Sequence, residues 1–360
     1  MPAPPLASSP CASYQAATRL VPGAAAINRD IIEALSEPAL VVEGGSIRLA
    51  NAAARAMLGT LIEGQDVRLA IRHPAAVERL IGPDTGTYDE VELVGLGEAA
   101  RRWTMNIAPI GGGSTLVRLR DKSEAHAAEQ MRVDFIANAS HELRTPLATL
   151  VGYAETLREQ GPDLDPETRD RFTAIVHDEA LRMQRLVEDL ISLSRIEAER
   201  FSTPREAISL PALVEQVVEG CRRAATKRGC DLTVEVEPGL PNAAGDPIQI
   251  LQLIENLVSN ALRYGRQGTP VSIRLAREGD MVRLSVSDQG EGIAAEHIPR
   301  ITERFYRVDP SRSRALGGTG LGMAIVKHIV ERHRGRLIIE SVVGKGTTFH
   351  VLLAAASPPS

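Results

Sequence analysis

Two stretches of the sequence carry apolar residues at the spacing of a coiled-coil seam, and this constrains the fold most. The seam of the first stretch consists of Ile136, Ala139, Leu143, Leu147, Leu150, Ala154 and Leu157. The seam of the second, from about 166 to 198, includes Phe172, Val176, Met183, Leu186, Leu190 and Leu193. The loop GPDLDP separates them, which predicts a helical hairpin. Because two helices bury little apolar surface, we expect a second copy to complete a four-helix bundle in a homodimer.

One histidine of the first stretch is predicted to face away from this seam. If Ile136 is position a of the heptad, His141 falls at position f, the outermost one. Thr145 follows four residues later on the same face. Pro146 removes a backbone donor and predicts a bend close to His141. A lone exposed histidine usually has no chemical role, but a phosphate donor elsewhere in the chain would favour one.

The bulk properties narrow the classes of function. A chain of 360 residues is long enough for two or three domains. The net charge of −5 and the 3% of aromatic residues argue against nucleic-acid binding. No apolar run reaches the roughly 18 residues of a membrane helix, so we expect no transmembrane segment and a cytoplasmic location. The three cysteines form no CxxC pair and no metal-ligand spacing, which fits a reducing compartment.

Changes in pattern along the chain predict a multidomain α+β protein. Residues 1–27 are rich in Pro, Ala and Ser and are expected to form a disordered tail. Residues 28–120 alternate short strands and helices, as a small α+β domain does. Residues 121–202 contain a charged helical stretch followed by the hairpin. In residues 203–356 helices alternate with strands, which predicts a sheet with helices packed on one face.

Four motifs in the last segment together predict a nucleotide site. Asn256 and Asn260 share one face of a predicted helix, and their amide oxygens suit Mg²⁺. Asp288 follows a strand and precedes a glycine turn, where a carboxylate can accept a hydrogen bond from the adenine amine. Glycines at 318, 320 and 322 stand at a helix start, which favours phosphate, and Gly344 and Gly346 form a further turn. Each motif alone is weak, but the ordered set spans only about 90 residues.

These motifs resemble those of bacterial sensor histidine kinases from two-component systems. The matching segments, in chain order, are DFIANASHELRTPL, LIENLVSNALRYG, DQGEGI, ERFYRVD, GGTGLGMAIVKHI and GKGTTF. The resemblance spans about residues 125–355. By element order alone, residues 28–120 resemble a PAS sensor domain. The arrangement is similar to that of phosphate-regulon sensors, which commonly carry transmembrane helices that this sequence does not show.

The resemblance implies a role for individual residues. His141 would be the phosphoacceptor, Glu142 the base, and Thr145 a residue for dephosphorylating the partner, a response regulator receiver domain. Asn260, with Asn256, would hold Mg²⁺ and the phosphates of ATP, and Asp288 would bind adenine. The remaining nucleotide residues would be Arg263, Tyr264, Gly290, Gly292, Phe305, Gly318, Thr319, Gly320, Leu321, Gly322 and Thr347. Phe305 and residues 310–320 would form a lid, and residues 203–356 an α/β sandwich.

Two other functions remain open at this point. A plain ATPase of the same superfamily is disfavoured because related ATPases carry a glutamate where this chain has Asn256, one turn before the Mg²⁺ asparagine. A non-catalytic dimeric signalling scaffold is disfavoured because every nucleotide motif is intact.

Overall fold

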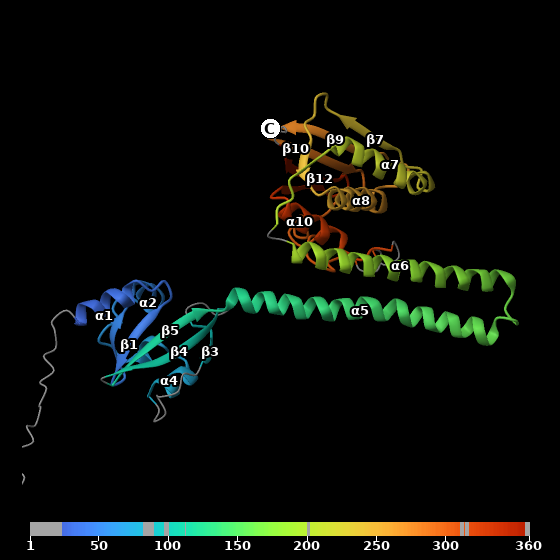
Figure 1. Ribbon diagram of the computed structural model, residues 1–360. Helices are drawn as coiled ribbons and strands as arrows, with labels where there is room; N and C mark the ends of the chain where they lie inside the picture. Colours follow the sequence, from blue (N-terminus) through green and yellow to red (C-terminus); the bar gives the residue numbers. More distant parts are fainter. Residues whose placement is uncertain are drawn as a thin grey trace, which may run out of the picture. The chain divides into compact units, whose positions relative to one another are not determined.

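The computed structural model describes residues 24–81, 90–96, 101–111, 113–199, 202–309, 313 and 317–356. It divides the chain into two compact units, Met1–Val133 and Asp134–Ser360 (Figure 1). The predicted tail lies almost entirely outside the described residues, as does most of the predicted lid before residue 317. Among the described helices, none combines the length and the apolar composition that a membrane crossing requires.

The first unit is built on an antiparallel sheet of five strands in the order β2-β1-β5-β4-β3. Its strands are β1 (Ala39–Glu43), β2 (Ser46–Ala50), β3 (Glu90–Val94), β4 (Arg102–Gly111) and β5 (Ser114–Asp121). Its helices are α1 (Ala24–Glu33), α2 (Ala52–Leu58), α3 (Val67–Ala70) and α4 (Pro74–Ile81). The stretch PALVVEGGSIRLAN predicts two strands around a Gly-Gly turn, and Gly44 and Gly45, between β1 and β2, have the positive φ angles of such a turn.

The core of this unit lies between the sheet and its helices. Met105 and Leu119 of the sheet are fully buried together with Val67 and Ile71 of the helical segment. Pro74 separates α3 from α4 and begins α4, because proline is tolerated in the first turn, where its missing donor costs nothing.

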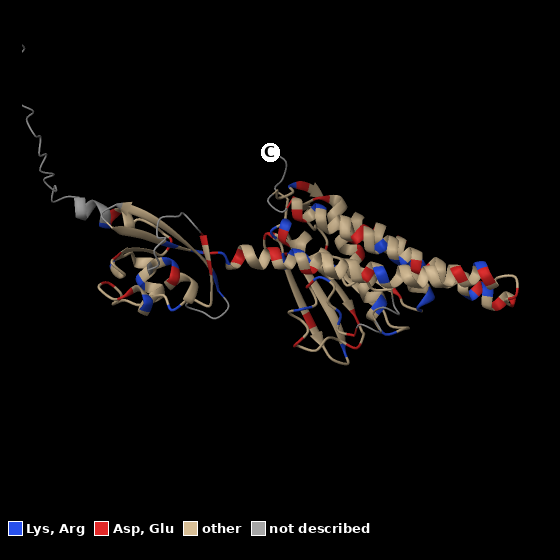
Figure 2. Ribbon diagram, turned by 90° about the horizontal axis from the view of Figure 1, so that it is seen from below, with Lys and Arg blue, Asp and Glu red and all other residues tan. Residues whose placement is uncertain are grey.

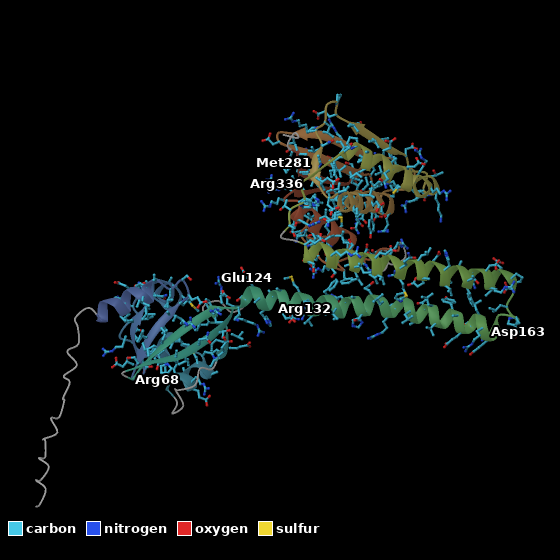
Figure 3. All side chains as sticks on the ribbon, in the orientation of Figure 1. Arg68, Glu124, Arg132, Asp163, Met281 and Arg336 are labelled. Carbon is cyan, nitrogen blue, oxygen red and sulfur yellow. The ribbon has the colours of Figure 1, made fainter. Side chains whose placement is uncertain are left out.

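The predicted hairpin is confirmed as α5 (Ser123–Gln160) and α6 (Pro166–Ala198). Figure 1 shows the two helices antiparallel, and Figure 3 labels Asp163 in the turn between them. Asp165 caps α6 by accepting a hydrogen bond from the N–H of Thr168. Figure 2 shows acidic and basic residues interspersed with uncharged ones along the helices. Helix α5 is assigned without a break through Pro146, which is buried, so the expected bend does not end the helix.

The C-terminal part is a second five-stranded sheet covered by three helices on one face. Its strands are β7 (Leu232–Val236), β9 (Val271–Glu278), β10 (Met281–Asp288), β11 (Arg336–Val342) and β12 (Gly346–Ala354). They follow the order β11-β12-β10-β9-β7, and only the β7–β9 pair is parallel. The helices are α7 (Leu210–Lys227), α8 (Pro247–Tyr264) and α10 (Gly322–Arg332). The short strands β6 (Glu206–Ile208) and β8 (Ala243–Gly245) pair separately.

The end of the hairpin shares the core of this C-terminal part. Leu186, Leu193 and Ile196 of α6 are buried in the same apolar cluster as Ile325 and Ile329 of α10. Packing of α6 on α10 brings side chains of the hairpin close to the nucleotide motifs.

Candidate functional site

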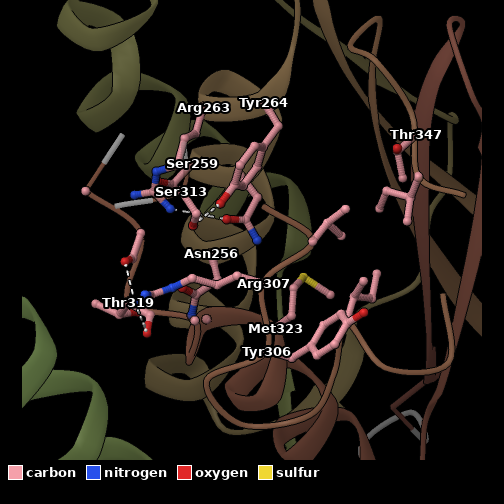
Figure 4. A pocket seen from close by; sticks show the side chains of 18 of the residues that line it. Asn256, Ser259, Arg263, Tyr264, Tyr306, Arg307, Ser313, Thr319, Met323 and Thr347 are labelled. Atoms are coloured by element: carbon pink, nitrogen blue, oxygen red, sulfur yellow. Dashed lines mark hydrogen bonds between the residues drawn. The ribbon is translucent and has the colours of Figure 1, made fainter. Parts of the chain in front are cut away.

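A cavity of about 340 Å³ lies where the segments that carry the four predicted nucleotide motifs meet (Figure 4). Eleven of its lining residues were predicted from the sequence: Asn256, Asn260, Arg263, Tyr264, Asp288, Gly292, Gly318, Thr319, Gly320, Gly322 and Thr347. They come from α8, the end of β10, the loop before α10 and the start of β12. The structure thus gathers residues that are up to about 90 positions apart in the chain.

Helix α8 supplies one wall of the cavity. Its N-terminus is capped by Asp246, whose carboxylate accepts hydrogen bonds from the N–H groups of Ile248 and Gln249. One face, which includes Leu253 and Leu257, is fully buried in the core. The polar residues at 256, 260 and 263 recur at helical spacing on the face toward the cavity. Amphipathic spacing therefore aims the two asparagines at the site.

Arg263 also lies at this wall. Its Nη1 donates to the Oδ1 of Asn260 at 3.4 Å. Burial lowers the pKa of the Arg263 guanidinium, and the neighbouring Tyr264 and Asp189 oppose this shift. A buried cation beside the asparagines suits a phosphate-bearing ligand.

Asp288 ends β10 at the back of the cavity. Its Oδ1 accepts a hydrogen bond from the N–H of Gly290 at 2.7 Å. Burial raises the pKa of the Asp288 carboxyl, while backbone N–H groups of Gly290 and Thr347 act in the opposite direction. A Cβ at position 346 would collide with the carbonyl of Asp288, which explains the glycine there. The carboxyl group is thus held between two tight turns and presented to the cavity.

The glycine-rich loop before α10 approaches the cavity through its backbone. A Cβ at Gly318 would lie 2.6 Å from the Oγ of Ser313, and one at Gly322 would lie 2.8 Å from the Oδ1 of Asn256. Gly320 has a φ of +77°, a conformation that favours glycine. These glycines let the loop backbone, with its N–H groups, pack closely against the residues that line the cavity, an arrangement that suits phosphate binding.

Arg307 is a site residue that the sequence reasoning missed, although it lies inside the ERFYRVD motif. Its side chain is only 5% exposed and lines the cavity. The Nη2 atom donates to the carbonyls of Gly318 at 3.0 Å and Thr319 at 2.9 Å. Its Nε is buried and has no hydrogen-bond partner among the described residues. Arg307 is thus bonded to the glycine-rich loop through Nη2, while its Nε–H has no acceptor among the described residues.

Helix α6 supplies another wall, which was also missed. Arg185, Glu188 and Asp189 line the cavity. The Oδ2 of Asp189 accepts a hydrogen bond from the Oγ1 of Thr319 at 2.7 Å. Burial raises the pKa of the Asp189 carboxyl, although Thr319 and nearby arginines lower it. The heptad pattern of α6 reports only its apolar seam, so it contains no signal for this contact.

A second cavity adjoins His141 and shares Tyr306 with the first. It is lined by Asn138, His141, Glu142, Arg300, Glu303, Arg304, Phe305 and Tyr306. His141 is exposed, as predicted, and the exposed Thr145 donates from Oγ1 to the His141 carbonyl at 3.4 Å. The carboxylate of Glu142 accepts two hydrogen bonds from Arg307, at 2.7 and 3.2 Å. One ion pair therefore connects the residue beside His141 with a residue of the first cavity.

Three predicted nucleotide residues do not line the first cavity. Phe305 lies at the His141 cavity, where its ring centroid is 5.9 Å from that of Phe135. Leu321 is fully buried in the core. Gly290 donates a hydrogen bond from its N–H to the carboxyl group of Asp288. A Cβ at position 290 would collide with the carbonyl of Tyr264.

Two family descriptions match the chain. Residues 131–199 match the His Kinase A (phospho-acceptor) domain. Residues 245–357 match the Histidine kinase-, DNA gyrase B-, and HSP90-like ATPase.

The chain is also similar to curated proteins. It is 37% identical over 316 residues to the phosphate regulon sensor protein PhoR of Pseudomonas aeruginosa, covering 87% of this chain and 70% of that protein. It is 37% identical over 243 residues to the sensor protein SrrB of Staphylococcus aureus, covering 68% of this chain and 41% of that protein. The chain thus spans less than half the length of SrrB.

The solved structures that match the chain include the histidine kinase AdeS of Acinetobacter baumannii. That match has a TM-score of 0.49 and 23% identity, and it covers 60% of this chain and 98% of AdeS. The histidine kinase ThkA, solved in complex with the response regulator protein TrrA, has a TM-score of 0.49 and 20% identity. The second match covers 91% of this chain and 98% of that chain.

Proposed function

Because the chain belongs to the sensor histidine kinases of two-component systems, we propose that His141 is the residue that receives the γ-phosphoryl group of ATP. The observation that carries this proposal is the Glu142–Arg307 ion pair. Glu142 follows His141 in the chain, and Arg307 lines the cavity that gathers the nucleotide motifs. One ion pair therefore connects the residue next to the acceptor imidazole with the cavity that would hold the phosphate donor.

The lining of the first cavity supports ATP as the donor. Adenine would lie at Asp288, whose carboxyl can accept a hydrogen bond from the exocyclic amine. The phosphates would lie along residues 318–322, where Gly318, Gly320 and Gly322 carry no side chain and Arg307 lies against the loop. The amide oxygens of Asn256 and Asn260 suit Mg²⁺, which would neutralise part of the phosphate charge.

The proposed reaction is an in-line phosphoryl transfer. One imidazole nitrogen of His141 forms a bond to the γ-phosphorus. The bond from this phosphorus to the bridging oxygen breaks, and ADP leaves with its electron pair. The proton on the other imidazole nitrogen passes to Glu142, which acts as the general base. The phosphoryl group then passes to an aspartate of a response regulator.

The apolar residues left exposed on the hairpin support a homodimer. Ile136, Leu147, Val151 and Ile191 have 46–57% of their surface exposed in the single chain. A second hairpin would bury such positions in a four-helix bundle. We therefore propose residues 121–202 as the dimerisation and phosphoacceptor domain. Residues 203–356, which supply most of the lining of the first cavity, are the proposed ATP-binding domain.

The first unit is proposed to be a PAS-type sensor over residues 28–120. Its five-stranded antiparallel sheet with short helices agrees with the element order that carries this resemblance.

We propose a cytoplasmic location for the described chain, because the proposed reaction consumes ATP.

Incubation of the purified chain with γ-labelled ATP and Mg²⁺ tests the proposal. We expect label on the protein that is labile in acid and stable in alkali, as a phosphorylated histidine is. His141→Gln should abolish the label while ATP still binds, because His141 lies outside the first cavity. The exposed His177, on α6, provides the control His177→Gln, which should label normally. Substantial label on His141→Gln would contradict the assignment, and ATP hydrolysis without label would favour a plain ATPase.

A further inference from the structure

Glu142 contacts arginines from two different parts of the chain. Its Oε1 accepts a hydrogen bond from Nη1 of Arg307 and its Oε2 from Nη2 of the same residue. The Oε2 atom also lies 3.8 Å from Nη2 of Arg182. The side chains of Arg307 and Arg182 are 5% and 14% exposed, so water screens both charges weakly. Two cations thus act on the carboxylate beside His141.

These arginines differ in what else holds them. Arg307 is bonded to the carbonyls of Gly318 and Thr319, so its position depends on the glycine-rich loop. Arg182 lies on α6, the helix that pairs with α5 in the hairpin. Its Nη1 donates to the Oε1 of Glu179 at 3.1 Å, one turn earlier on the same helix. This bond orients the Arg182 guanidinium without any help from the loop.

A phosphate-bearing ligand in the first cavity would compete with Glu142 for Arg307. Arg307 lines that cavity, and its buried Nε has no hydrogen-bond partner among the described residues. If Arg307 turns to the ligand, the Oε1 of Glu142 loses its bond, while Oε2 keeps Arg182 nearby. A carboxylate bonded through both oxygens accepts a proton poorly, whereas one restrained through a single oxygen can accept it on the other.

We infer that Arg182 is a positioning residue that keeps Glu142 beside His141 after Arg307 has moved to the nucleotide. This inference rests on the proposed function, in which Glu142 accepts the imidazole proton. Arg182 touches neither cavity, so it acts on the reaction only through Glu142.

The test measures the rate of His141 labelling against ATP concentration in the full chain. Arg182→Gln should lower the maximum rate about tenfold, a fraction of what a general base contributes, and leave the KM for ATP within twofold. Arg182→Lys should recover part of the rate, since it keeps the charge. In the Glu142→Gln background, Arg182→Gln should have no further effect, because the two residues act as a unit. The exposed Arg169 of α6 provides the control Arg169→Gln, which should label at the normal rate.

The outcomes separate this inference from the function on which it rests. A normal maximum rate in Arg182→Gln, or a raised KM alone, would overturn the role of Arg182. Additive losses in the double variant would overturn it as well, since they would mean that Arg182 acts independently of Glu142. Full activity of Glu142→Gln would contradict the proposed base, and label on His141→Gln would contradict the proposed function itself.

Discussion

Thr319 donates a hydrogen bond from Oγ1 to the carboxylate of Asp189 at 2.7 Å, across 130 positions of sequence. This bond ties the glycine-rich loop to helix α6 of the hairpin. The Thr319 hydroxyl also accepts from the N–H of Leu321, so the loop and the start of α10 share one anchor. A conformational coupling between hairpin and nucleotide site can act through this contact.

Removing the Asp189 carboxylate should strengthen nucleotide binding. Asp189→Ala frees the Thr319 loop and deletes a buried negative charge from the wall that would face the phosphates. The repulsion between the Asp189 carboxylate and the phosphates is worth about 1 kcal/mol. Its removal should therefore lower the Kd for ATP about fivefold. Isothermal titration with a non-hydrolysable ATP analogue measures this change. Asp178→Ala, with a side chain that is 82% exposed on the same helix, is the matched control. An unchanged or weaker affinity in Asp189→Ala would show that the bond does not oppose binding.

Asp288→Ala should weaken ATP binding. The substitution removes the carboxyl proposed to bind the adenine amine, and a lost hydrogen bond to a charged group costs about 1.5–3 kcal/mol. The Kd should therefore rise about 10- to 100-fold, with a parallel loss of His141 labelling at low ATP. Asp280→Ala changes an exposed carboxylate in the turn after β9 and should bind normally. Normal affinity in Asp288→Ala would place adenine elsewhere.

Thr145→Ala is expected to slow dephosphorylation of the response regulator without affecting autophosphorylation of His141. The hydroxyl lies one turn after His141 on the exposed face and could position a water molecule near a docked phospho-aspartate. Autophosphorylation of His141 should persist, while decay of phosphorylated regulator in the presence of kinase and ADP slows about tenfold. Thr145→Ser, which keeps the hydroxyl, should decay like the unmodified chain. If the regulator decays at the same rate with Thr145→Ala as with the unmodified chain, Thr145 has only a structural role next to Pro146.

His333 should make the stability of the C-terminal part depend on pH. Its ring is buried, its Nε2 accepts from the N–H of Asp246 at 3.0 Å, and its Nδ1 donates to the Ile329 carbonyl at 2.7 Å. Burial lowers the pKa of His333 below its usual value of 6.5, with Arg332 acting in the same direction. The unfolded chain thus binds the proton more readily, so the free energy of unfolding should fall as the pH drops below 6.5.

Denaturant unfolding between pH 8 and pH 5 measures this effect. His333→Gln removes the titrating group and should flatten the profile relative to the unmodified chain, even if its stability is lower throughout. His177→Gln, at an exposed position, should leave the profile unchanged. Equal pH dependence with and without His333 would mean that other groups account for it. His328, whose pKa is also lowered by burial, is the first alternative.

Much of the architecture follows from local spacing. The heptad spacing from about 166 to 198 predicted the extent of α6. The alternation of apolar and polar residues in RRWTMNIAPI and STLVRLRD predicted β4 and β5. The predicted multidomain α+β fold class is confirmed by the two separate five-stranded sheets and their helices. The three-residue strands β6 and β8 are too short to show a period, and they exist only because their partners meet in space.

The sequence by itself determined the long helices, the longer strands and the glycine turns, since each depends on neighbours a few positions apart. It also determined the chemistry available at His141, Asn260 and Asp288. Only the tertiary structure decided that Arg307 reaches Glu142 across 165 positions and that Asp189 faces Thr319. The reason is physical: both contacts depend on how the hairpin packs against the C-terminal part, and no local period records which side chains two packed elements bring together.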